Sequence, residues 1–181
     1  FMLLKIFLFE IRYWLKQPMV YIFLFINALL IFGATSSDSV TVGGSVGNVN
    51  KNAPFVVENF YAVMSIISLL MVTAFLNVAA ARDFSFNTHQ IIFSTPLKKV
   101  QFLLGRFFGA AFIAIIPFLG VSIGSITGAM MPWVNAERIG PTSLDGNPMG
   151  LLVFIIPNVI FCVSFIFAIA AMTMSSCQTF Q

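Results

Sequence analysis

The sequence predicts an all-α membrane protein, a polytopic helix bundle with about four transmembrane helices and an interfacial helix at its N-terminus. Of its 181 residues, 59% are hydrophobic and only 8% are charged, whereas soluble domains carry about 25% charged residues. Four stretches contain no charged residue at all: 17–37, 59–81, 107–136 and 146–181. Each holds an apolar core close to the roughly 20 residues that a helix needs to cross the hydrocarbon layer.

Residues 1–17 precede the first apolar stretch and predict an amphipathic helix on the cytoplasmic leaflet. At about 100° per residue, the basic side chains fall on one narrow stripe and apolar ones lie opposite. The basic stripe consists of Lys5, Arg12 and Lys16, and the apolar face contains Leu3, Phe7 and Trp14. Glu10 lies off the basic stripe, and two interpretations stay open: it extends to the lipid headgroups, or it contacts a neighbouring helix.

Residues 18–181 are expected to form the transmembrane domain, with spans at about 19–34, 60–81, 107–131 and 151–173. Pro117 and Pro157 lie inside the third and fourth spans and predict kinks there. The third span also contains Gly120, Gly124 and Gly128 on one face. This spacing of small residues predicts a close approach by another helix.

Asparagines are the polar residues expected at membrane depth: Asn27, Asn77 and Asn158. They would either bond between helices or line a path, and Asn77 and Asn158 are the candidates for pathway-lining residues. No charged residue lies at the centre of a span, which argues against a proton relay or an ion-coupled carrier.

Basic residues predict the orientation. Seven of the nine Lys and Arg residues lie in the N-terminal segment or in the 82–106 segment, and only Lys51 and Arg138 lie in the other two loops. The positive-inside rule therefore places the N-terminus and the 82–106 segment in the cytoplasm. The 35–58 and 132–149 loops then face outward.

The 82–106 segment indicates a protein partner. Asn87 to Phe93 predict a short cytoplasmic helix with an apolar surface, and the next helix is expected to start at Thr95-Pro96 and continue into the third span. An apolar surface beyond the membrane favours contact with another protein. Lying on the lipid headgroups is the alternative for this short helix.

The sequence offers little recognisable chemistry. There is no phosphate-binding loop, and with only one histidine, His89, we expect no serine–histidine pair in the membrane. We expect no catalytic residue, no metal site and no enzymatic activity in this chain. The basic residues form no single patch, so nucleic acid is not an expected partner.

One pattern within the 82–106 segment resembles a known cytoplasmic loop. It consists of Arg82-Asp83, Thr88, Ser94 to Lys99 (STPLKK) and Phe102 to Arg106 (FLLGR). It is similar to the loop between the second and third spans of ABC transporter permeases of the second exporter type. The whole chain looks especially like the N-terminal part of permeases from the Bacteroidetes group, some of which are fused to a zinc aminopeptidase domain. Since that family has six spans, we expect the chain to be truncated before spans five and six.

The resemblance implies a multi-pass permease subunit of an ABC exporter in the bacterial cytoplasmic (inner) membrane, working by alternating access. ATP and Mg²⁺ would be bound by a separate ABC ATPase subunit, and a second permease copy or half would complete the transporter within the lipid. Lys98, Lys99 and Arg106 would hold the following helix at the anionic inner leaflet. The implied ATPase-coupling residues are Arg82, Asp83, Asn87, Thr88, His89, Gln90, Ile91, Ile92 and Phe93. The alternative function is a non-transport membrane scaffold or assembly subunit.

Overall fold

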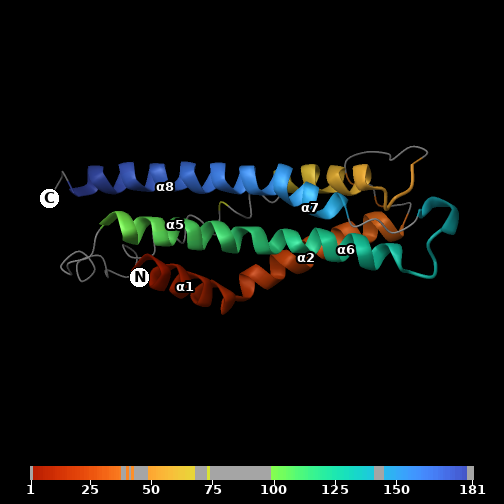
Figure 1. Cartoon of the computed structure of the whole chain (residues 1–181), viewed down its shortest axis with the longest axis horizontal. Helices are drawn as coiled ribbons and strands as arrows, with labels where there is room; N and C mark the ends of the chain where they lie inside the picture. The colour runs from red at the N-terminus through yellow and green to blue at the C-terminus, as the bar shows by residue number, and fades with distance from the viewer. Residues whose placement is uncertain are drawn as a thin grey trace. The chain divides into compact units, whose positions relative to one another are not determined.

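The computed structural model in Figure 1 describes residues 2–37, 40, 42, 49–67, 73, 99–140 and 145–178. Within these ranges the chain is built from helices and contains no strand, which confirms the predicted all-α class. The elements are α1 (Met2–Leu15), α2 (Pro18–Ser36), the helix Pro54–Ile67, α5 (Lys99–Ile115), the 3₁₀ turn η1 (Ile116–Phe118), α6 (Leu119–Ala129), the 3₁₀ turn η2 (Ala136–Arg138), α7 (Gly146–Gly150), the π-helical turn η3 (Leu151–Ile155) and α8 (Ile156–Gln178).

Three helices in the described ranges are long and apolar enough to cross a membrane: Pro18–Ser36, Val100–Ala129 and Gly146–Ile169. They lie over three of the four predicted spans, and the chain is therefore a helical membrane protein. Of the remaining predicted span, 60–81, the structure describes only 60–67 and Thr73. The other residues of that span lie outside the described ranges.

The chain divides into two compact units, which are described separately. The first comprises Phe1–Gln17, Leu69–Ala114 and Val159–Gln181, and the second comprises Pro18–Ser68 and Ile115–Asn158. Buried apolar side chains of the first unit include Trp14, Ala110, Ile113 and Val163. Those of the second include Ile31, Phe60, Tyr61, Phe118 and Ile155.

Both predicted kink positions coincide with a change of helix type. Pro117 lies in the 3₁₀ turn η1 between α5 and α6. Pro157 is the second residue of α8, directly after the π-helical turn η3. A proline lacks the N–H that would continue the α-helical ladder, and 3₁₀ or π turns commonly form at such interruptions.

In the second unit, α2 and α6 run in the same direction. Gly120 lies against Leu24, and Gly128 lies against Thr35, so both residue numbers rise together along the contact. The end of α2 and the end of α6 are therefore at the same end of this unit.

The 54–67 helix runs in the opposite direction to α6. Its start is close to the residues that follow α6, since Asn52 is hydrogen-bonded to Gly140. Further along, Tyr61 is hydrogen-bonded to Ser122 in the first half of α6. The segments that follow α2 and α6 therefore meet at one end of the second unit.

Candidate functional site

In the first unit, two glycines of α5 let α1 approach its backbone. A Cβ atom added at Gly105 would lie 2.9 Å from Cγ2 of Ile6, and one added at Gly109 would lie 2.7 Å from Cβ of Glu10. Both separations are shorter than the contacts that real Cβ atoms make, so a side chain at either position would displace α1. This contact is not among the sequence-based predictions, although Gly105-x-x-x-Gly109 has the same small-residue spacing as the repeat in the third span.

An ion pair lies beside these glycines. Nε of Arg106 donates a hydrogen bond to Oε1 of Glu10 at 3.0 Å. The side chains of Arg106 and Glu10 are only 7% and 2% exposed. Of the two interpretations for Glu10, contact with a neighbouring helix is the one that the structure supports, and extension to the headgroups is wrong.

The expectation that Arg106 holds its helix at the anionic leaflet is also wrong. Its guanidinium lies buried against α1 rather than at a lipid surface, because the missing side chain at Gly109 leaves room for Glu10 beside it. A buried charge that loses its partner is strongly destabilising. The pair therefore fixes α1 to α5 at one specific position along the two helices.

The opposite face of α1 has the character of an interfacial helix. Lys5, Arg12 and Lys16 are exposed, as the basic stripe predicts. Large apolar side chains are exposed between them, including Leu8 and Phe9. One face of α1 therefore contacts protein, while the other offers apolar and cationic groups to a lipid surface.

In the second unit, Gly120, Gly124 and Gly128 lie directly against α2. A Cβ atom added at Gly120 or Gly124 would first meet a backbone carbonyl oxygen of α2, that of Leu24 or Ala28, and one added at Gly128 would first meet Cβ of Thr35. Backbone-to-backbone packing of this kind requires small residues. The three glycines and the facing surface of α2 form what we call the glycine seam.

Asn27 lies at the Gly120 end of the glycine seam. Its side chain is fully buried, and Nδ2 donates a hydrogen bond to the carbonyl oxygen of Pro117 at 3.0 Å. Asn158 makes a comparable bond, because its Nδ2 donates to Oγ of Ser65 at 3.1 Å. Both contacts favour the interpretation of these asparagines as bonds between helices, whereas Asn77 lies outside the described residues.

No protein-family model, curated protein or solved structure matches this chain. In the described ranges, no group of three or more His, Cys, Asp and Glu side chains is placed to hold a metal ion.

The predicted ATPase-coupling residues lie outside the described ranges. This applies to Arg82, Asp83, Asn87, Thr88, His89, Gln90, Ile91, Ile92 and Phe93. Lys98 is also outside them, and α5 begins at Lys99. The structure thus describes the helix that follows the coupling segment, with its contacts to α1, but not the segment itself.

The hydrogen bond from Asn27 predicts a measurable effect on stability. Replacing Asn27 with Ala should lower the free energy of unfolding by about 1 kcal/mol, since the hydrogen bond from its side chain to the Pro117 carbonyl oxygen is lost. Unfolding in detergent by increasing dodecyl sulfate measures this. The control is Ser164→Ala, which removes an exposed hydroxyl bonded only to Ile160 of its own helix. Equal effects of the two substitutions would show that the Asn27 bond contributes nothing specific.

Proposed function

We propose that this chain is a transmembrane permease subunit of an ABC exporter in the bacterial inner membrane, driven by a separate ATPase subunit. The observation that supports this most is the buried Glu10–Arg106 pair. It fixes the N-terminal helix to the first turns of α5, and α5 directly follows the segment expected to contact the ATPase. A force applied to that segment would reach α1 and α5 together.

The pair gives this coupling a physical basis. Separating Glu10 from Arg106 would leave two buried charges unpaired, which raises the free energy of the protein strongly. The close approach at Gly105 and Gly109 adds tight packing over the same turns. Under load, α1 and the start of α5 would therefore move as one body, as a transmitting element requires.

The arrangement of the second unit is compatible with the predicted orientation. The segments after α2 and after α6 meet at one end, as expected if the 35–58 and 132–149 loops both face outward. The N-terminus and the 82–106 segment would then face the cytoplasm, where an ATPase and its ATP and Mg²⁺ are available. A second permease copy or half would complete the transporter.

Coexpression with a neighbouring ATPase tests the proposal. The full-length protein and the ABC ATPase encoded beside it should copurify in detergent. Replacing both Ile91 and Phe93 with Asp should reduce the ATPase recovered by about tenfold or more, because apolar anchors dominate interface energies.

The matched control introduces two Asp residues at exposed valines of the other predicted side, Val40→Asp with Val49→Asp. This variant should retain the ATPase. If the well-folded parent protein recovers no ATPase, the permease proposal fails and the scaffold function is favoured. If both double variants lose the ATPase equally, the 82–106 segment is not the docking site.

A further inference from the structure

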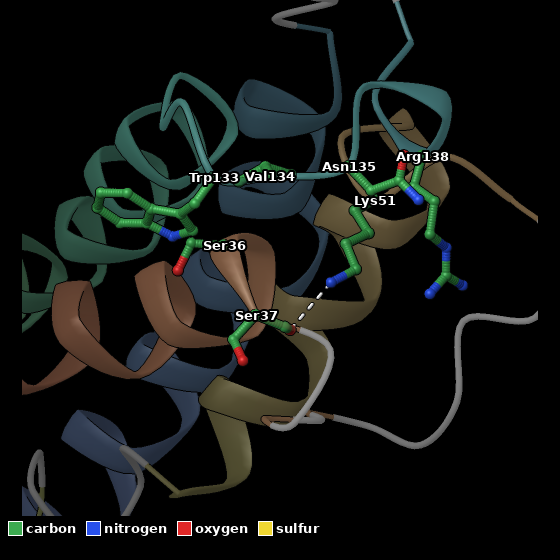
Figure 2. A pocket seen from close by; sticks show the side chains of 7 residues that line it. All are labelled: Ser36, Ser37, Lys51, Trp133, Val134, Asn135 and Arg138. Carbon is green, nitrogen blue, oxygen red and sulfur yellow. Dashed lines mark hydrogen bonds between the residues drawn. The ribbon is translucent and has the colours of Figure 1, made fainter.

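A polar pocket lies at the end of the second unit where its connecting segments meet (Figure 2). Its volume is about 330 Å³, and it is lined by Ser36, Ser37, Lys51, Trp133, Val134, Asn135 and Arg138. Ser36 is the last residue of α2, and Trp133 follows α6 closely in the chain. The pocket therefore lies where two apolar helices end.

Hydrogen bonds hold the two sides of this pocket together. The backbone N–H of Lys51 donates to the carbonyl oxygen of Arg138 at 2.9 Å. Next to it, Asn52 bonds Gly140 twice, with Nδ2 donating to the Gly140 carbonyl at 2.7 Å and Oδ1 accepting from its N–H at 2.8 Å. The segments are thus fixed to each other, and the pocket is a built feature of the unit.

Among the described lining residues, the charged ones are both basic. Lys51 and Arg138 are the two basic residues that the sequence places in these loops, and the described residues that line the pocket include no carboxylate. Lys51 is only 6% exposed, and its Nζ donates to the carbonyl oxygen of Ser37 at 2.9 Å. A nearly buried ammonium and a guanidinium in the lining of one pocket favour an anion there, and a guanidinium matches phosphate geometry particularly well.

The residues around the pocket favour a position at the level of lipid headgroups. Trp133 is 65% exposed and Met130 is 77% exposed, although both are large apolar residues. Tryptophan is enriched at the boundary between hydrocarbon and water. An anion bound here would therefore share the pocket lining with the exposed indole of Trp133, which suits a molecule with acyl chains.

We propose that this pocket binds a phosphate-bearing anion, and that its source is the headgroup of an anionic phospholipid. The phosphate would lie between Lys51 and Arg138, with the acyl chains passing over Trp133 and Met130. The proposal requires only that the chain is a membrane protein. It holds whether or not the chain is a permease.

Tryptophan fluorescence tests this directly, because the chain has only two tryptophans. Trp14→Phe leaves Trp133 as the single reporter beside the pocket. In bilayers of phosphatidylcholine, brominated phosphatidylglycerol should quench Trp133 more than an equal mole fraction of brominated phosphatidylcholine does. Replacing Lys51 and Arg138 with Gln should weaken apparent lipid binding by about tenfold, because charge-assisted hydrogen bonds are lost.

The control variant, Arg12→Gln with Lys16→Gln, changes the net charge equally but alters exposed residues of α1. It should keep the preference for phosphatidylglycerol. Arg138→Gln alone, which leaves the Lys51 bond to Ser37 in place, should show an intermediate loss. Equal quenching by both brominated lipids in the parent, or equal loss in the control, overturns the proposal. If inorganic phosphate displaces the brominated lipid at millimolar concentration, the source is a soluble phosphate and the lipid assignment is overturned.

Discussion

Replacing Arg106 with Met should lower the free energy of unfolding by about 3–5 kcal/mol, because the carboxylate of Glu10 stays buried without its cation. Glu10→Leu should have a comparable effect by leaving the guanidinium of Arg106 buried. The double variant should recover a large part of the loss, since replacing a buried pair by apolar side chains is often close to neutral. Dodecyl sulfate unfolding of the four proteins in a double-mutant cycle measures the coupling between the two positions.

Arg12→Met provides the matched control. Arg12 is a cation of the same helix as Glu10, but its side chain is exposed. This substitution should change stability by no more than about 0.5 kcal/mol. Two results would contradict the assigned role of the pair. One is that the single variants lose no more stability than Arg12→Met does. The other is that the double variant loses as much free energy of unfolding as the two single variants lose together.

Replacing Gly124 with Ala should separate α2 from α6 and destabilise the protein by about 1–3 kcal/mol, because an added methyl group overpacks the contact. The added Cβ would meet the carbonyl oxygen of Ala28 and lie 3.0 Å from the backbone N of Phe32. Neither backbone atom can move without moving α2. Thermal unfolding in detergent, followed by circular dichroism, measures the loss.

The same substitution at Gly33 is the control. A Cβ there would lie 3.6 Å from the nearest carbon of Val40, which is ordinary contact. Gly33→Ala should be neutral or stabilise by about 0.5–1 kcal/mol, since alanine is the better helix former. If Gly124→Ala is no worse than Gly33→Ala, the glycine seam is not tightly packed in the membrane.

The sequence predicted which faces would pack but not what they would pack against. The spacing of Gly120, Gly124 and Gly128 indicates a close helix contact by itself. Nothing local identifies α2 as the partner, because every apolar span offers a surface that fits lipid and protein equally well. The choice depends on contacts between residues far apart in the chain.

The same reason explains the missed ion pair and pocket. Glu10 and Arg106 are 96 residues apart in the chain. The sequence by itself is compatible with either side chain lying at the membrane surface. From the sequence, Lys51 and Arg138 are simply two basic residues in different loops. Their meeting depends on the bonds between Asn52 and Gly140, which span 88 residues.

The start of the last long helix shows tertiary contacts overriding local preference. Residues 146–150, GNPMG, contain two glycines and a proline and predict a loop, yet they form α7. Gly146 lies against Pro54, and Gly150 lies against the ring of Tyr61. The glycines let the two segments approach closely, which compensates for their poor intrinsic helix propensity.

The glycine seam also has a consequence for biosynthesis. Asn27 and the Pro117 carbonyl that accepts its hydrogen bond are 90 residues apart in the chain. At about 5–20 residues per second, the ribosome needs roughly 5–18 s to make the intervening stretch. During that interval α2 has entered the bilayer with Asn27 lacking this partner. Until Pro117 has been made, the insertion machinery must shelter that amide or leave it in lipid.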